Sequence, residues 1–349
     1  MKEVNRNASS AVLGYEFQIN IAILFMFRYL KDIISLEVEG EKEDIEITFA
    51  DKNKYMIQAK SQTKDLNDNK NNISKLKKSL ISLAEADNKN VKRLYYVSNM
   101  TNPLNTTSND FDYSGITEKF YNELSLESKD VIDTQIKNNI KSENDEKYNI
   151  DTDKLVIMKV PFFGTIDREK HKYIVDEAKT VLALISDTLM VKSESIIKYC
   201  ESKFIDNGTN PKVSISKKEF CNWIILTELA SMDLSNDNIN IGIEDTEYYD
   251  AYQSYQKYVD EKISTYENYL KVYSLYNRRK QMGYITINEF VKQEKLKLYN
   301  FFFQENLEKE NQINDSNRLD VYISQIISYA ILKKKSIIDK IKKEANLWK

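Results

Sequence analysis

The sequence predicts an α/β N-terminal domain followed by an all-α C-terminal region. Residues 44–50 and 54–61 alternate between polar and apolar side chains and flank the polar turn 51–53, which is typical of a β-hairpin. From Asp167 onward, apolar residues recur at spacings of three and four, as on the buried face of a helix. The 349 residues include only 7 Gly and 3 Pro, and this composition favours long regular elements.

A helix and three strands are predicted first. Ser9 or Ser10 can cap a helix that runs to about residue 31. A strand at 33–39 then leads into the hairpin. After a polar linker, a helix from about 73 to 86 places its leucines on one face and its lysines on the other.

Two further strands are predicted at 92–100 and 155–160. We interpret the polar residues near 101–150 as an insertion with short helices at 115–124 and 128–141. The order is therefore helix, three strands, helix, strand, insertion, strand. This is the order of a restriction-endonuclease-like (PD-(D/E)xK) core, whose mixed sheet carries an acid and a [DEQ]-x-K motif on its second and third strands.

The chain is longer than most single domains, so we expect two domains, at residues 1–165 and 166–349. Segment 247–279 carries tyrosines and aliphatic residues along one face, which is typical of a seam between packed helices or subunits. We therefore interpret the second domain as a module for oligomerisation or partner interaction, in preference to a base-stacking platform. Other helices are predicted there at 174–191, 216–230 and 318–349.

The composition excludes several kinds of site. The net charge of −3 restricts any polyanion site to a local patch. Cys200 and Cys221 lack CxxC spacing, so we expect reduced core thiols. The single histidine, His171, excludes chemistry that needs several histidines, and we expect it at the surface or at a helix cap.

The sequence also lacks the P-loop, GxGxxG and GxSxG motifs, which argues against nucleotide hydrolysis, dinucleotide binding and α/β-hydrolase chemistry. The apolar run 19–27 is too short to span a bilayer, and no signal for export is recognised. We therefore expect a cytoplasmic protein that does not enter a membrane.

The hairpin carries side chains suited to phosphodiester hydrolysis. If its loop has three residues, position 46 faces 58 and position 44 faces 60, so that Asp44, Gln58 and Lys60 share one side of the sheet. Carboxylate and amide oxygens can ligate Mg²⁺, and a lysine beside them can orient a water or neutralise charge on a phosphate. The alternative is the ordinary solvated face of a hairpin.

Other polar residues are candidates for the same site. Gln18 lies just before the apolar run of the first helix, so it either caps that run or points into the site. Glu37 and Glu39 either supply a second acid or face water. Lysines near the second helix either neutralise a DNA backbone or lie on a solvated helix face: Lys64, Lys70, Lys75, Lys77 and Lys78.

Three motifs occur in order along this region: Gly14-Tyr15-x-x-Gln18, Glu-Asp44-Ile45 and Ile57-Gln58-Ala59-Lys60-Ser61. Together they resemble the bacterial CD-NTase-associated dsDNA endonuclease family, which are PD-(D/E)xK nucleases that serve as effectors of anti-phage systems. The resemblance covers about residues 9–100 and extends more weakly to about 165.

The resemblance implies Mg²⁺-dependent cleavage of double-stranded DNA, with Mn²⁺ as an alternative cofactor. Gln takes the place of a carboxylate in the third-strand motif, which leaves the metal site with less charge. The upstream acid could match Glu37, Glu39 or Glu41. The implied metal ligands are Asp44 and Gln58, the lysine beside the attacking water is Lys60, and Gln18 and Glu39 complete the candidate site.

In one branch of that family the nuclease is fused to a cyclic-oligonucleotide sensor domain. The helical, Tyr-rich half does not resemble that sensor domain and looks more like the Lamassu type of effector. That analogy implies a complex with an SMC-like ATPase and a small accessory subunit, and a nuclease that acts on release or as a homo-oligomer. Two alternatives stay open. One is a catalytically inactive nuclease fold that serves as a DNA-binding or scaffold subunit, and the other is a nuclease gated by a cyclic oligonucleotide.

Overall fold

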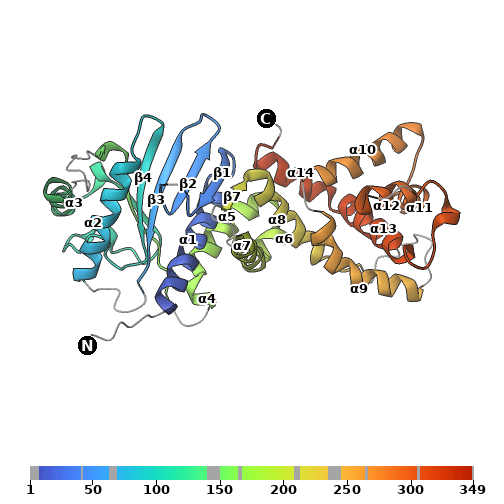
Figure 1. Ribbon diagram of the computed structural model, residues 1–349, viewed down its shortest axis with the longest axis horizontal. Helices are drawn as coiled ribbons and strands as arrows, with labels where there is room; N and C mark the ends of the chain where they lie inside the picture. Colours follow the sequence, from blue (N-terminus) through green and yellow to red (C-terminus); the bar gives the residue numbers. More distant parts are fainter. Residues whose placement is uncertain are drawn as a thin grey trace. The chain divides into compact units, whose positions relative to one another are not determined.

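The computed structural model describes residues 8–40, 42–62, 69–139, 150–163, 167–207, 213–234, 245–263, 266–304 and 307–347. The chain divides into two compact units, residues 1–217 and 218–349 (Figure 1). The predicted domain boundary, between residues 165 and 166, lies inside the first unit. The first unit combines helices with a sheet, and the second is helical, so the broad α/β and helical division of the chain agrees with the prediction.

The first unit is built on a mixed sheet of seven strands in the order β5-β6-β4-β3-β2-β1-β7. Strands β3, β4 and β6 run parallel, and the other neighbouring pairs run antiparallel. The carboxyl ends of the three parallel strands therefore lie at one edge of the sheet. The strands are β1 (Ile33–Val38), β2 (Ile45–Phe49), β3 (Lys54–Lys60), β4 (Val91–Ser98), β5 (Thr117–Phe120), β6 (Leu155–Lys159) and β7 (Val213–Ser216).

Helix α1 (Ala8–Arg28) and helix α2 (Asn69–Ala86) pack on opposite faces of this sheet. Two consecutive residues of β4 show this, since side chains alternate between faces along a strand. Tyr95 lies edge-on to Phe25 of α1, with ring centroids 5.0 Å apart. Tyr96 belongs to the buried cluster beneath α2.

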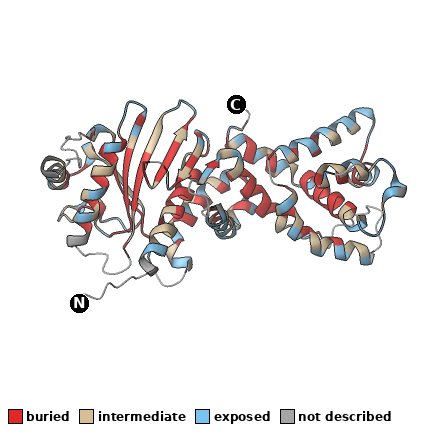
Figure 2. Cartoon of the chain, in the orientation of Figure 1, coloured by how far each residue is buried: buried red, intermediate tan, exposed pale blue. Residues whose placement is uncertain are grey.

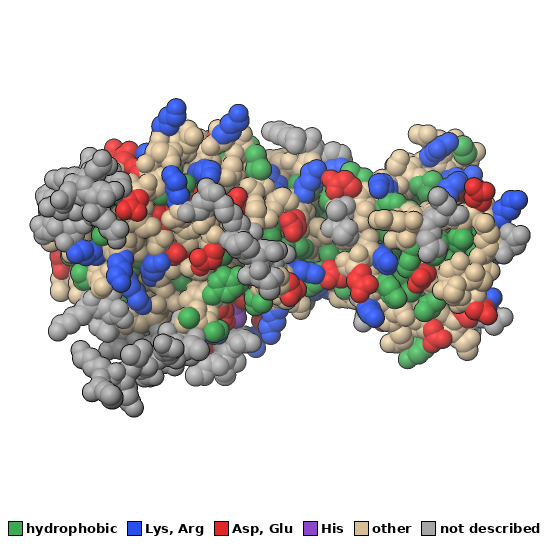
Figure 3. Space-filling model, viewed as in Figure 1, with side chains coloured by type: hydrophobic (Ala, Val, Ile, Leu, Met, Phe, Trp, Pro, Cys, Tyr) green, Lys and Arg blue, Asp and Glu red, His purple; other side chains and the backbone are tan. Residues whose placement is uncertain are grey.

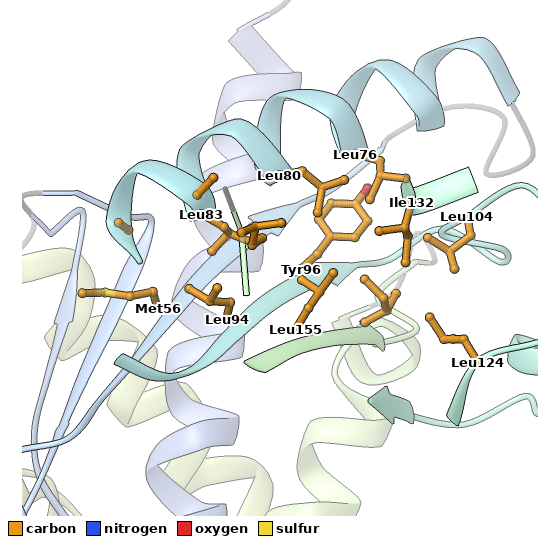
Figure 4. Close-up of a cluster of buried hydrophobic side chains, with 14 of the residues drawn as sticks. Met56, Leu76, Leu80, Leu83, Leu94, Tyr96, Leu104, Leu124, Ile132 and Leu155 are labelled. Atoms are coloured by element: carbon orange, nitrogen blue, oxygen red, sulfur yellow. The ribbon is translucent and has the colours of Figure 1, made fainter. Parts of the chain in front are cut away.

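The apolar face of α2 explains how this helix is held. Leu76, Leu80 and Leu83 repeat at spacings of four and three and are at most 1% exposed. They point toward Leu94 and Tyr96 of β4 (Figure 4). Burying a leucine side chain contributes about 1.5–3 kcal/mol, so this stripe is a main anchor of α2 on the sheet.

Helix α1 is apolar around most of its circumference because it is covered on more than one side. It contacts β1 and β3 of the sheet and also α5 (Lys172–Ile185) and α7 (Ser193–Asn207). Buried residues line α1 and the strands in Figure 2. Residues 11–28 of this helix are long and apolar enough to cross a membrane by length and composition, and 61% of that stretch is buried within the protein.

The region predicted as a helical insertion also contributes a strand to the sheet. The helix expected at 115–124 is wrong, because residues there form β5 and a short 3₁₀ helix, η2 (Tyr121–Glu123). Pairing with β6, from Thr117 opposite Lys159 to Phe120 opposite Val156, outweighs the local helical pattern. The other predicted helix is confirmed as α3 (Leu126–Asn139), and two further 3₁₀ helices are η1 (Asn109–Phe111) and η3 (Thr152–Lys154).

The prediction that the chain is wholly helical after residue 166 is wrong at β7. Strand β7 pairs antiparallel with β1, where Leu36 lies opposite Ile215. This pairing and the packing of α5 and α7 on α1 include these segments in the first unit. The remaining helices of this unit are α4 (Asp167–Lys170) and α6 (Asp187–Val191).

In the second unit, the predicted tyrosine-rich seam forms two helices, α9 and α10, instead of one. Several of its tyrosines are core residues: the hydroxyl of Tyr255 donates to the carbonyl of Leu229 (2.9 Å), and that of Tyr269 donates to Asn222 (2.7 Å). The helices are α8 (Lys217–Ala230), α9 (Asp245–Lys262), α10 (Glu267–Met282), α11 (Ile287–Gln293), α12 (Lys295–Phe303), the 3₁₀ helix η4 (Glu310–Gln312), α13 (Arg318–Lys333) and α14 (Lys335–Glu344).

Candidate active site

The predicted hairpin forms, but its register differs by two residues from the prediction. Glu46 lies opposite Met56, and Ile45 lies opposite Ile57, so the expected pairing of 46 with 58 is wrong. The turn lies one residue earlier than assumed, because the backbone N–H of Phe49 donates to the carbonyl of Asn53 (3.0 Å); within this turn Asp51 accepts the backbone N–H of Asn53 (3.0 Å). A shift of two residues preserves which face each side chain occupies.

Asp44 and Lys60 meet at the carboxyl edge of β3. One oxygen of Asp44, Oδ2, accepts both the Lys60 ammonium (2.7 Å) and the backbone N–H of Ala59 (2.9 Å). The two side chains are 14% and 28% exposed, so this ion pair is partly screened from water. The structure therefore brings together the acid and the lysine that the sequence selected.

Gln58 lies beside this pair, in a buried hydrogen-bonded group that includes a residue we did not predict. Its Nε2 donates to Oε2 of Glu43, and the hydroxyl of Ser82 on α2 donates to Oε1 of Glu43 (3.0 Å). Gln58 and Glu43 are 6% and 3% exposed. Burial raises the pKa of Glu43 to about 7, with a smaller contribution from the Asp44 charge, against the hydrogen bonds from Gln58 and Ser82.

Strand alternation alone would have placed Glu43 and Asp44 on opposite faces, so the sequence pattern pointed away from Glu43. The turn between β1 and β2 changes this. The backbone N–H of Glu39 donates to the carbonyl of Asp44 (2.8 Å), and that of Gly40 to the carbonyl of Glu43 (3.0 Å). Because residues 42–44 bend before β2 begins, both carboxylates can reach the end of β3. The sequence signal that could have identified Glu43 is that it is an acid directly before the motif aspartate, Asp44.

The other predicted acids are not joined to this group. Glu39 is exposed, has a left-handed backbone (φ 53°), and its charge contributes, after burial, to the raised pKa of Tyr15 on α1. Glu37 lies opposite Glu46 in the sheet. Within the described residues, no hydrogen bond or ion pair links the side chain of either acid with Asp44. Glu41 lies outside the described residues.

Gln18 is half-buried on α1, on the face of the sheet opposite α2. Its Oε1 atom is buried and accepts no hydrogen bond within the part of the chain that the structure describes. In that part, no hydrogen bond joins Gln18 to Asp44, Gln58 or Lys60 either. The structure therefore leaves its predicted role in the site as a prediction.

A second unpredicted residue, Asn99, holds the segments that follow two of the parallel strands. Its Oδ1 accepts the backbone N–H of Gln62 (2.8 Å), and its Nδ2 donates to the carbonyls of Gln62 and Phe162 (both 3.0 Å). Asn99 is 1% exposed. These bonds fix the chain just beyond Lys60, and therefore support the edge at which the candidate site lies.

The predicted lysine cluster is only partly available as countercharge. Lys75 is used within the fold, because its ammonium donates to the carbonyl of Ser61 (2.6 Å). Lys78 is exposed and Lys77 is half-buried. Figure 3 shows basic side chains interspersed with acidic ones over the face in view. Lys64 and the side chain of Lys70 lie outside the described residues.

Asp44 and Gln58 are the residues that could hold a cation. Oδ1 of Asp44 and Oε1 of Gln58 accept no hydrogen bond from the described residues, whereas Oδ2 of Asp44 and Nε2 of Gln58 are engaged. The described residues include no group of three or more His, Cys, Asp or Glu side chains that could hold a metal. A cation here would therefore take most of its ligands from water or a phosphate, which suits Mg²⁺ better than Zn²⁺.

His171 lies away from this group; it is buried instead of being at the surface, but it takes the N-cap position of α5, the other place predicted for it, without a side-chain capping bond. It is 7% exposed, precedes α5, and its Nε2 lies 2.8 Å from Oε1 of Glu201 on α7. Burial against Phe162, whose ring centroid is 5.4 Å away, accounts for its position. His171 therefore helps to join α5 and α7 beneath α1.

The chain was compared with models of protein families, with curated proteins and with solved structures, and none of them matches it.

Proposed function

We propose that this protein is a metal-dependent double-stranded DNA endonuclease with a PD-(D/E)xK-type site in its first unit. The observation that carries the proposal is the ion pair of Asp44 and Lys60 (2.7 Å) at the carboxyl edge of β3, the strand that also carries Gln58. An acid, an amide oxygen and an ammonium group at one edge suit phosphodiester hydrolysis.

The roles follow from the contacts of each side chain. Asp44 and Gln58 would hold a Mg²⁺ or Mn²⁺ ion through their free oxygens. When bound, such an ion would lower the pKa of a water and offset charge on the scissile phosphate. Lys60 has three N–H donors and gives one to Asp44, so it can hold a water or a phosphate oxygen with another. The hydrogen bond from Ala59 fixes Asp44 for this task.

The helical second unit would hold the nuclease within a larger assembly. We propose that the protein is an effector of anti-phage defence, bound to an SMC-like ATPase and a small accessory subunit, and active on release or self-association. The support is the resemblance of the three sequence motifs together with a separate compact helical unit.

The experiment is cleavage of supercoiled plasmid in Mg²⁺ or Mn²⁺, over a range of protein concentrations so that self-association is included. Lys60→Ala and Asp44→Ala should each lower the rate by about 100-fold or more, because each removes a group acting at the reacting phosphate. Lys54→Ala is the matched control, since Lys54 lies on the same strand and pairs with Glu46 of β2 (3.2 Å). It should retain nearly full activity.

Equal cleavage by wild type, Lys60→Ala and Asp44→Ala would refute the proposal. A second candidate function is a catalytically inactive DNA-binding or scaffold subunit, favoured by the small number of carboxylates available to a metal among the described residues. Salt-sensitive DNA binding without cleavage, in any metal and at any protein concentration, would support that alternative.

A further inference from the structure

The side-chain amide of Gln58 has two chemically different ends, and only its oxygen can ligate a cation. An amide that rotated freely would present its NH₂ group to the cation for part of the time and would repel it. The usefulness of Gln58 as a ligand therefore depends on what fixes its orientation. The NH₂ group of this amide donates to Glu43 and, over a longer distance of 3.5 Å, to the hydroxyl of Ser82, and the charged Glu43 is the stronger acceptor.

When ionised, Glu43 is suited to this task because a carboxylate only accepts hydrogen bonds. Its Oε2 therefore faces the NH₂ end of Gln58, and its Oε1 is occupied by the hydroxyl of Ser82 (3.0 Å). With its nitrogen held by Glu43, Gln58 directs its oxygen away from Glu43. Both carboxylate oxygens of Glu43 are engaged in hydrogen bonds, so Glu43 is poorly placed to ligate a cation itself.

We propose that Glu43 is a positioning residue that fixes the amide of Gln58 with its oxygen toward the cation, and that Ser82 of α2 holds Glu43 in place. This inference rests on the proposed function, because it assigns Gln58 as a ligand. The chain of contacts runs from α2 through Ser82 and Glu43 to Gln58 on β3, so it ties the anchored helix to the candidate site.

The test measures binding of Mn²⁺ to the full chain by electron paramagnetic resonance, together with plasmid cleavage. Glu43→Leu should weaken Mn²⁺ binding by about 10–100-fold, as is usual for the loss of a residue that orients a ligand. Glu43→Gln keeps an acceptor for Gln58 and should retain most of the affinity. Ser82→Ala should cause a smaller loss, and Ser79→Ala on the same helix, whose hydroxyl lacks a partner among the described residues, should cause none.

A double-mutant cycle separates positioning from a general effect on the fold. In a Gln58→Leu background the amide is gone, so adding Glu43→Leu should not weaken Mn²⁺ binding further. A second loss of 10-fold or more in that background, or equal losses in Glu43→Gln and Glu43→Leu, would overturn the assignment. So would a Glu43→Leu chain that is folded and binds Mn²⁺ as tightly as the wild type.

Different results would overturn the proposed nuclease function and the positioning role of Glu43. A wild-type chain that binds no Mn²⁺, with or without DNA, would overturn the nuclease assignment and the role of Glu43 with it. A wild-type chain that binds Mn²⁺ and cuts DNA, but is insensitive to Glu43→Leu, would overturn the role of Glu43 alone. Lys60→Ala separates cleavage from metal binding, because this variant should lose cleavage while it still binds Mn²⁺.

Discussion

Asn99 offers a direct test of how the edge beside the candidate site is stabilised. Replacing it with leucine, which has the same branched side-chain skeleton but no polar atoms, removes its three hydrogen bonds to Gln62 and Phe162. Each buried hydrogen bond contributes about 1 kcal/mol on balance, so Asn99→Leu should lower the free energy of unfolding of the first unit by about 3 kcal/mol. For a unit of this size that corresponds to a fall in its melting temperature of about 6–12 °C.

The loss should also be local. The N–H of Gln62 donates directly to Asn99, so its hydrogen exchange should become faster in the variant. Hydrogen exchange followed by mass spectrometry on peptides covering residues 54–62 measures this separately from unfolding of the helical unit. Because the same segment follows Lys60, DNA cleavage should slow as well. Asn109→Ala, at an exposed asparagine, is the control and should change stability by less than about 0.5 kcal/mol. Wild-type exchange and stability in Asn99→Leu would refute the reasoning.

Two further predictions concern stability. Leu80→Ala should destabilise the first unit by about 2–5 kcal/mol in urea unfolding, because Leu80 is 1% exposed beneath α2; Leu184→Ala, at a 67% exposed position, should cost almost nothing, and equal effects would contradict the packing described. Burial alone would raise the pKa of Asp110, but hydrogen bonds from Ser128, Ser125 and Ser108 lower it overall. A lowered pKa stabilises the fold above the pKa of the unfolded state, and the effect is lost as pH falls through the folded value. Asp110→Ala should therefore destabilise the protein at pH 7 and lose this effect progressively as the pH falls below 3.8, the ordinary pKa of aspartate. Unfolding curves across this range that show the same difference at every pH would show the inference to be wrong.

The central elements of the first unit were predictable because their signals are long. The helices over α1 and α2 and the strands β1 to β4 and β6 carry repeated apolar patterns, and each was expected at close to its observed position. Strands β5 and β7 were missed because each has only four residues and gains its structure from a neighbour, β6 or β1. A pattern so short cannot be separated from a turn of helix in the sequence alone.

The candidate site shows the same division between long and local signals. The convergence of Asp44 and Lys60 followed from strand alternation, and it survived an error of two residues in register because alternation has a period of two. Glu43 and Asn99 were missed because neither belongs to a repeating pattern. Glu43 reaches Gln58 through a bend before β2, and Asn99 reaches Gln62 through the loops beyond β3 and β4, so both depend on tertiary structure.

The charge of the site separates the two candidate functions on physical grounds. Asp44 gives one oxygen to Lys60 and Ala59, so only its second oxygen and the neutral amide of Gln58 would be left for a cation. Such a site should hold Mg²⁺ weakly by itself and gain its remaining ligands from a DNA phosphate. Binding linkage is reciprocal, so if DNA strengthens metal binding, the metal must strengthen DNA binding by the same factor. A nuclease therefore requires coupled binding of metal and DNA at this edge, whereas an inactive scaffold would bind DNA through lysines and arginines with no dependence on Asp44.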